Sequence, residues 1–155
     1  MPEIKEILFD EGTFTTIPKR VEEICALIKP LDMTWSCNAR ADVPFETLRK
    51  MKEAGCRLVI TGFESANPEI LNTIRKGVTL ERMQKFLKDC KKVGILVHGT
   101  FMIGLPGETK QTIENSFKFA VKMDLNSIQF SVAAPYPGTE FWNYLNERDW
   151  LIGSN

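Results

Sequence analysis

The sequence ILVHGTFMIGLPGET, residues 95–109, decides the fold class. Its first nine residues are mostly apolar, which predicts a buried strand over residues 95–103. A turn rich in glycine and proline follows, and Glu108 or Thr109 then caps a helix that continues toward residue 121. A buried strand that passes through a tight turn into a helix is typical of a parallel α/β sheet.

The same alternation extends along the chain on both sides of this unit. Further strands are predicted at residues 4–9, 34–39, 57–62 and 127–133. Apolar residues at helical spacing, bounded by proline and glycine, predict helices at residues 18–28, 42–54, 67–75, 79–93 and 138–145. Because parallel neighbours need a crossover of about a dozen residues, this order indicates a parallel sheet. The pattern leaves two architectures open, a partial (β/α) barrel and an open doubly wound sheet.

Two local predictions concern the helices. Asn67 precedes Pro68 and Glu69, which is the pattern of a helix start with a capping side chain. The helix after residue 109 carries four apolar side chains on one side. These residues are Ile113, Phe117, Ala120 and Val121.

The composition fits a single domain over residues 1–155. Apolar residues make up 43% of the chain, enough for a hydrophobic core, and 20 basic residues balance 20 acidic ones. No basic stripe indicates nucleic-acid binding, and no apolar stretch is long enough to span a membrane.

Four cysteines are spread widely along the chain. Cys25, Cys37, Cys56 and Cys90 are 12, 19 and 34 residues apart, unlike the closely spaced ligands of iron–sulfur clusters or zinc. Cys25 and Cys90 fall on the apolar sides of predicted helices and are interpreted as buried thiols. This usage indicates a reducing, cytoplasmic setting.

Polar residues follow the predicted strands. The acidic pair Asp10 and Glu11 follows the first strand, Arg40 the second, and Glu64 with Ser65 the third. The carboxyl ends of parallel strands converge on one crevice, so these side chains are candidates for a shared site. Carboxylates hold ammonium groups or hydroxyls, and arginine binds a carboxylate through two parallel hydrogen bonds. The set therefore suits a zwitterionic, ribose-bearing ligand.

Each of these residues also has a purely structural interpretation. Asp10 and Glu11 fit a solvated loop, and Arg40 fits a surface ion pair with Asp42. The Gly-Leu-Pro-Gly-Glu-Thr run after residue 103 fits a tight turn with a helix cap. The residues by themselves do not choose one ligand among several.

Five short motifs in order resemble the radical S-adenosylmethionine superfamily. They are FDEGTF (residues 9–14), WSCNARAD (35–42), GFES (62–65), FMIGLPGET (101–109) and PYPGT (135–139). Their spacing is similar to that of strands two to six in the superfamily's barrel, and the likeness is closest to the cobalamin-dependent branch, including hopanoid-biosynthesis members. The resemblance implies a partial parallel (β/α) barrel of about five strands with alternating helices, its first strand missing.

The resemblance also implies a binding site for S-adenosylmethionine. Asp10 and Glu11 lie where the superfamily holds the methionine amino group, and Arg40 lies where a side chain approaches the carboxylate or ribose. Further cofactor contacts are implied for seven residues on or just after the later strands, and the last five of these lie around the adenine. These residues are Glu64, Ser65, Met102, Ile103, Gly104, Pro135 and Tyr136.

The activity implied by the resemblance belongs to the complete protein. In the superfamily a [4Fe–4S] cluster, held by a Cys-x3-Cys-x2-Cys motif, cleaves S-adenosylmethionine reductively to a 5′-deoxyadenosyl radical. This chain has no such motif. We therefore expect an internal fragment of the barrel that is inactive alone, with the cluster ligands and any cobalamin-binding domain outside it. The expected substrate is a small molecule or a lipid-like compound.

Two alternatives remain. A degenerate barrel could act as a non-catalytic binding or interaction module. An unrelated (β/α)8 enzyme with a phosphate site is disfavoured, because the sole histidine, His98, lies near the start of its strand and away from the crevice. Truncation would also leave an unpaired strand edge, which favours association into an oligomer.

Overall fold

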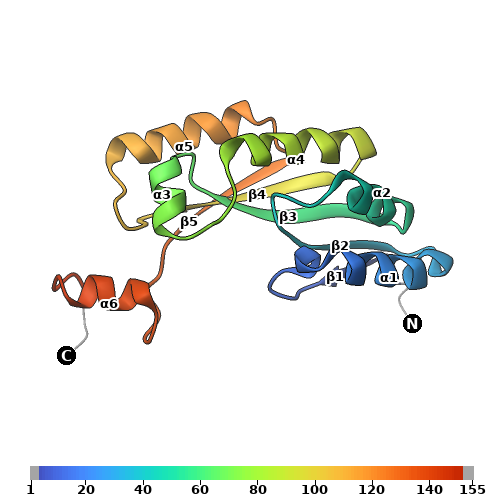
Figure 1. The fold of residues 1–155 in the computed structure, drawn as a ribbon, viewed down its shortest axis with the longest axis horizontal. Helices are drawn as coiled ribbons and strands as arrows, with labels where there is room; N and C mark the ends of the chain where they lie inside the picture. The colour runs from blue at the N-terminus through green and yellow to red at the C-terminus, as the bar shows by residue number, and fades with distance from the viewer. Residues whose placement is uncertain (1–3, 152–155) are drawn as a thin grey trace.

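The computed structural model describes residues 4–151 and contains one parallel sheet in the order β1-β2-β3-β4-β5 (Figure 1). Each strand pairs with the next one along the chain. The strands are β1 (Glu6–Phe9), β2 (Thr34–Ala39), β3 (Cys56–Glu64), β4 (Leu96–Ile103) and β5 (Ser127–Val132). The predicted five-stranded parallel α/β fold is confirmed.

Helices connect the strands and lie along one side of the sheet, while α6 stands apart from the others (Figure 1). The α-helices are α1 (Pro18–Ile28), α2 (Phe45–Glu53), α3 (Pro68–Thr73), α4 (Leu80–Val93), α5 (Lys110–Lys122) and α6 (Glu140–Asn146). Two 3-10 helices, η1 (Phe14–Thr16) and η2 (Lys29–Leu31), flank α1. A doubly wound sheet reverses its strand order and has helices on both faces. The sequential order here is that of a partial barrel.

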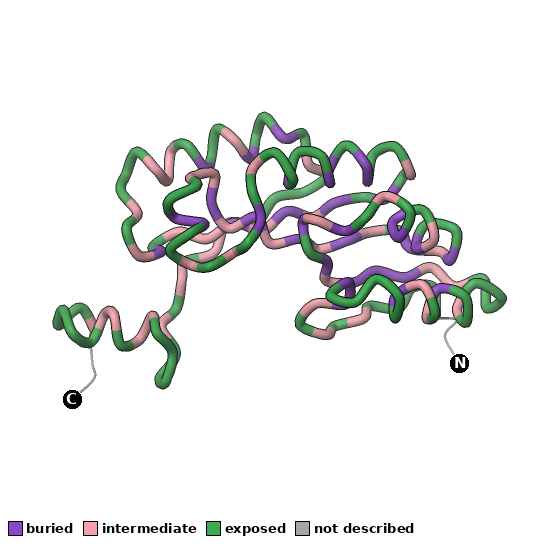
Figure 2. The backbone as a smooth tube through the Cα atoms, in the orientation of Figure 1, coloured by how far each residue is buried: buried purple, intermediate pink, exposed green. Residues whose placement is uncertain are grey.

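The hydrophobic core lies between the sheet and these helices (Figure 2). On β2, Trp35 and Cys37 are fully buried, and the Trp35 indole N–H donates to the Ala54 carbonyl oxygen at 2.7 Å. On the β5 side, the Phe130 ring stacks against Phe117 of α5, with centroids 4.0 Å apart. These contacts anchor α2 and α5 to the sheet.

The opposite face of the sheet is open. Along β4, Val97 and Phe101 are buried on the helix side, whereas His98 and Thr100 are only partly buried. Alternate residues of a strand point to opposite faces, so the partly buried set lines the open side. This side is the concave one in Figure 1 and is left free by the helices.

Helix boundaries follow the predicted caps closely. Thr79 and Thr109 accept hydrogen bonds from the backbone N–H groups of Arg82 and Thr112, and so cap α4 and α5. Gly94 ends α4 with a φ of 77°, a left-handed conformation that glycine adopts without a Cβ penalty.

The predicted cap by Asn67 was wrong, and the apolar side of α5 is only partly covered. Asn67 occupies the N-cap position of α3, but its side chain makes no capping hydrogen bond and instead reaches α5, where Nδ2 donates to the Thr112 carbonyl oxygen at 2.8 Å. On α5, Val121 is 77% exposed and Phe117 is 43% exposed, so the apolar stripe extends beyond the side that the sheet covers.

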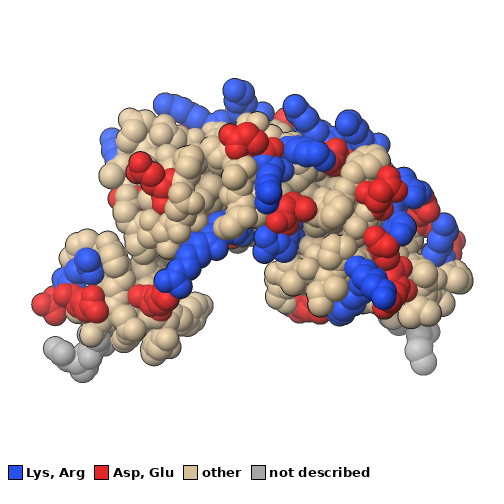
Figure 3. Space-filling model, in the orientation of Figure 1, with Lys and Arg blue, Asp and Glu red and all other residues tan. Residues whose placement is uncertain are grey.

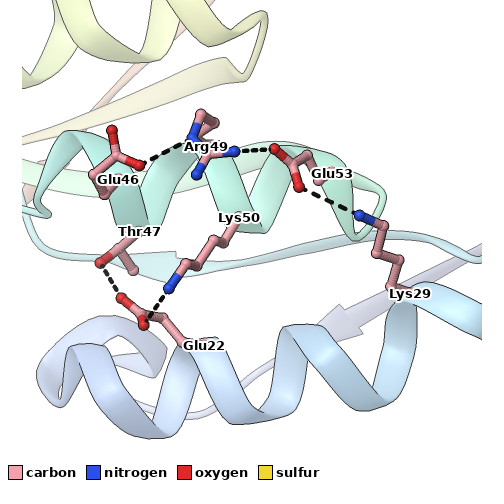
Figure 4. A network of polar contacts seen from close by, with 7 residues as sticks. All are labelled: Glu22, Lys29, Glu46, Thr47, Arg49, Lys50 and Glu53. Carbon is pink, nitrogen blue, oxygen red and sulfur yellow. Dashed lines mark hydrogen bonds and ion pairs between the residues drawn. The ribbon is translucent and has the colours of Figure 1, made fainter.

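A chain of ion pairs joins α1 to α2 across their outer surfaces (Figure 4). Glu22 accepts from Lys50 Nζ at 2.6 Å and from the Thr47 hydroxyl at 3.3 Å. Lys29 Nζ lies 3.3 Å from a Glu53 carboxylate oxygen. Exposed pairs contribute about 0–1 kcal/mol each, so this network orients the two helices more than it stabilises them.

No helix within residues 4–151 is long and apolar enough to cross a membrane.

Candidate functional site

A cleft of about 450 Å³ opens at the carboxyl ends of β1, β2 and β3. We call it the strand-end cleft. Its walls come from the loops that follow these strands, from the loop between α3 and α4, and from the open face of the sheet. The lining residues are Gly12, Thr13, Asn38, Ala39, Arg40, Ala41, Ile60, Gly62, Glu64, Ile74, Arg75, Lys76, Val78 and Thr100. The molecule is hollowed on its lower side in Figure 3, and basic and acidic side chains meet along the upper edge of that hollow.

Arg40 enters the strand-end cleft from the loop after β2. Its backbone N–H donates to the buried Thr15 hydroxyl at 2.9 Å, which fixes the start of the loop. Its guanidinium binds Asp42 through two hydrogen bonds, Nε to Oδ1 at 2.9 Å and an Nη to Oδ2 at 2.8 Å. This hydrogen bonding to Arg40 lowers the pKa of the Asp42 carboxyl. The Arg40 guanidinium therefore lies at the cleft and is held in place by the Asp42 carboxylate.

Glu64 enters the same cleft from the end of β3. Its φ of 63° lies in the left-handed region, and the β3–β4 register shifts between Gly62 and Glu64. Its Oε1 accepts from Lys76 Nζ at 3.0 Å, and both side chains are mostly buried. A Cβ on residue 62 would collide with Glu64 Oε1, so glycine is needed for the carboxylate to lie over the sheet.

Asp10 and Glu11 lie at the edge of this site. Glu11 forms two hydrogen bonds with Arg20 of α1, at 2.8 and 3.2 Å, so its carboxylate is turned toward the helix. The Asn38 amide donates to the Glu11 carbonyl oxygen at 3.1 Å and lies 3.4 Å from Asp10 Oδ1. The residues that line the cleft from this loop are Gly12 and Thr13.

Ser65 does not face the strand-end cleft. It is fully buried, and its hydroxyl lies 3.3 Å from the Ser116 hydroxyl of α5. It is thus directed toward the helix layer.

The predicted adenine-side residues lie further along the sheet. Ile103 and Gly104 line a second cleft, of about 400 Å³, between the turn after β4 and α6. Glu108 shapes this turn, because its Oε2 accepts the backbone N–H of Gly104 at 2.7 Å. Met102 and Pro135 are partly buried, and Tyr136 is 69% exposed. The structure brings Arg40 and Glu64 into one cleft and places Gly104 in another.

Lys76, the cation that pairs with Glu64 in the strand-end cleft, was missed by sequence reasoning. Lys76 lies in a loop between two helices, 12 positions after its partner Glu64, and no spacing rule predicts their contact. Asn38, which also lines the cleft, belongs to the WSCNARAD motif at the end of the second predicted strand.

The described residues do not fit an iron–sulfur cluster. Within residues 4–151, no group of three or more histidine, cysteine or acidic side chains could hold a metal ion. All four cysteines are buried, as predicted for Cys25 and Cys90. Burial raises the pKa of Cys25 to about 11 and that of Cys90 to about 12. These thiols are packing residues of the core.

Comparisons with known proteins agree on one family. The family model described as "Radical SAM superfamily" matches residues 1–120. An uncharacterized methyltransferase of Pyrococcus horikoshii, PH0819, is 42% identical over 98% of this chain and 34% of its own length. Bacteriochlorophyllide d C-8(2)-methyltransferase of Chlorobaculum tepidum is 29% identical over 85% of this chain and 32% of its own length. The chain thus spans about a third of the curated relatives that it matches.

Solved structures share the fold. The radical S-adenosylmethionine methyltransferase TsrM of Kitasatospora setae, solved with cobalamin and a [4Fe–4S] cluster, superposes with a TM-score of 0.84 at 20% identity, over 94% of this chain and 29% of that one. The cobalamin-dependent radical enzyme OxsB superposes with a TM-score of 0.64 at 17% identity, over 94% of this chain and 23% of that one. At this level of identity the likeness concerns the fold.

Proposed function

The chain belongs to the Radical SAM superfamily, and on that premise we propose that its strand-end cleft binds S-adenosylmethionine as part of the catalytic barrel of a complete enzyme. The observation that carries this proposal is that Arg40, Glu64 and Lys76 share one cleft of about 450 Å³. A cation and an anion side by side suit a zwitterionic amino-acid group.

Different residues of the cleft are proposed to contact different parts of the ligand. Lys76 and Arg40 offer ammonium and guanidinium groups for the ligand's carboxylate, and each is at present held by an acid of this chain. Glu64 offers a carboxylate for ribose hydroxyls or the ammonium group. Ile60 and Val78 form an apolar part of the cleft wall, against which a flat ring such as adenine can lie. The adenine contacts of Met102, Ile103, Gly104, Pro135 and Tyr136, and the contacts of Asp10, Glu11 and Ser65, stay predictions.

The complete protein is proposed to be a methyltransferase. PH0819 and the bacteriochlorophyllide enzyme carry that activity in their names, and this supports methyl transfer as the class of reaction. In the superfamily, S-adenosylmethionine supplies a 5′-deoxyadenosyl radical after one-electron reduction by a [4Fe–4S] cluster. The described residues offer no ligands for that cluster, so this chain's part is to bind and orient the nucleoside and methionine groups and to exclude water. The use of a cobalamin cofactor, and of a small-molecule or lipid-like substrate, is likewise proposed for the complete protein.

Titration calorimetry of the complete protein with S-adenosylmethionine tests the binding role. We expect the wild type to bind, and Arg40→Ala and Glu64→Ala each to weaken binding about tenfold or more, because each removes a charged hydrogen-bonding partner. Arg49→Ala is the matched control, since Arg49 pairs with Glu46 at 2.9 Å on the outer surface of α2. Absence of binding by the wild type would contradict the proposal and support the non-catalytic interaction module.

A further inference from the structure

The end of β3 holds Glu64 in a conformation that its residue type disfavours. Its φ is 63°, a region where the Cβ of an L-residue crowds the backbone. The register shift at Gly62 leaves an extra residue, Phe63, between the pairings of Gly62 with Thr100 and of Glu64 with Phe101. A strained conformation of this kind persists only where the surrounding structure holds it.

A buried network of hydroxyl and amide groups holds the residues that follow. Ser65 and Ser116 are 0% and 1% exposed, and their hydroxyl oxygens are 3.3 Å apart. The backbone N–H of Ala66 donates to Ser116 Oγ at 3.0 Å. Asn67 Nδ2 donates to Ser65 Oγ at 3.1 Å and to the Thr112 carbonyl oxygen at 2.8 Å. The loop of residues 65–67 is thereby fastened to α5.

The network uses the full hydrogen-bonding capacity of both hydroxyls. Ser116 donates its proton to the Thr112 carbonyl oxygen at 3.2 Å, so the proton between the two serines comes from Ser65. Ser65 then accepts from the backbone N–H and the side-chain amide of Asn67, at 3.2 and 3.1 Å. A hydroxyl has one donor and two acceptor positions, and here all are occupied. Neither serine has a position left for a ligand.

We propose that Ser116 is a positioning residue for the strand-end cleft, an inference that rests on the proposed function. Ser116 holds the loop of residues 65–67 against α5, and the loop holds Glu64 in its left-handed conformation. That conformation turns the Glu64 carboxylate over Gly62 and onto Lys76, 3.0 Å away. Ser116 acts on ligand binding only through Glu64.

A double-mutant cycle tests this role. S-adenosylmethionine is titrated by calorimetry into the complete protein as the wild type, Ser116→Ala, Glu64→Ala and the double variant. We expect Ser116→Ala to weaken binding about tenfold, which is about 1.4 kcal/mol. In the Glu64→Ala background we expect no further loss from Ser116→Ala, because the carboxylate that it positions is gone.

Thr47→Val is the matched control for loss of a buried hydroxyl. Thr47 is 2% exposed and donates to Glu22 at 3.3 Å, between α1 and α2. We expect it to lower stability and leave the affinity for S-adenosylmethionine unchanged. If Ser116→Ala does not fold, Ser116→Cys, which has the same shape with a somewhat larger atom and forms weaker hydrogen bonds, takes its place in the cycle.

The outcomes separate the two proposals. Wild-type binding with no effect of the residue 116 variant, or with losses that add in the double variant, would overturn the positioning role and leave the proposed function standing. Failure of the wild type to bind would overturn both.

Discussion

Lys76 Nζ lies 3.0 Å from Glu64 Oε1, so the loop between α3 and α4 is tied to the carboxyl end of β3. The Lys76 and Glu64 side chains are 25% and 19% exposed, whereas those of Arg40 and Asp42 are 42% and 24% exposed. Partial burial makes the loss of one partner costly, because the remaining charge keeps little water. This pair closes one wall of the cleft.

The first prediction concerns this ion pair. We expect Lys76→Met to lower the free energy of unfolding by about 1–2 kcal/mol, because the mostly buried Glu64 carboxylate would be left without a partner. Urea denaturation followed by circular dichroism measures the change. The double variant Lys76→Met, Glu64→Gln should regain part of the loss, and equal stability of Lys76→Met and the wild type would show that the pair contributes nothing.

The second prediction concerns Gly62. A Cβ at this position would meet Glu64 Oε1 and, at 3.1 Å, Lys76 Nζ, which are the ends of flexible side chains. We expect Gly62→Ala to cost about 1 kcal/mol or less in stability but to displace the ion pair and weaken S-adenosylmethionine binding several-fold. Thermal unfolding and calorimetry measure the two effects. Gly12→Ala is the stability control, since a Cβ there has no atom within 4 Å, and a larger loss of stability for Gly12→Ala would contradict the reasoning.

The third prediction is a pH dependence. The hydrogen bonds from Arg40 lower the pKa of Asp42 below its ordinary value of 3.8. A carboxyl whose pKa is lower in the folded state contributes stability above its unfolded pKa, and that contribution is lost as the pH falls through the folded pKa. We expect Asp42→Asn to cost about 1 kcal/mol or less at neutral pH, since Arg40 is partly exposed, and to match the wild type at pH values below the folded pKa. Denaturation at a series of pH values tests this, and a difference that grows toward acid pH would be the opposite result.

The fourth prediction concerns the thiols. Burial raises the pKa of Cys25 to about 11 and of Cys90 to about 12, and the hydrogen bond with Cys37 raises that of Cys56 as well. Only the thiolate attacks an alkylating reagent, so we expect slow labelling of these cysteines by iodoacetamide at pH 8 in the native protein. Complete labelling is expected in urea. Intact-mass measurement over time checks this, and rapid native labelling of any of them would contradict the burial.

Local signals were enough where neighbouring residues decide the structure. The strand over residues 34–39 was predicted with its observed bounds, because a short run of strand-forming residues between turn residues is a property of consecutive positions. Thr109 caps α5 as predicted, since a capping hydroxyl needs only an N–H three residues later. Contacts between residues far apart in the sequence could not be predicted from such local signals. Asn67 has the sequence of a helix cap, yet its amide bonds to Thr112, 45 residues away, once α5 packs beside α3.

The sequence by itself determined the number and parallel direction of the strands, and that polar residues follow them, because hydrophobic periodicity and turn residues act over a few neighbouring positions. Only the tertiary structure decided which of those polar residues meet. It turned Glu11 toward Arg20 and Ser65 toward Ser116, and it brought Lys76 to Glu64. The physical reason is that a side chain's partner is set by the packing of separate elements and by single backbone dihedrals, such as the φ of 63° at Glu64, which no local pattern specifies.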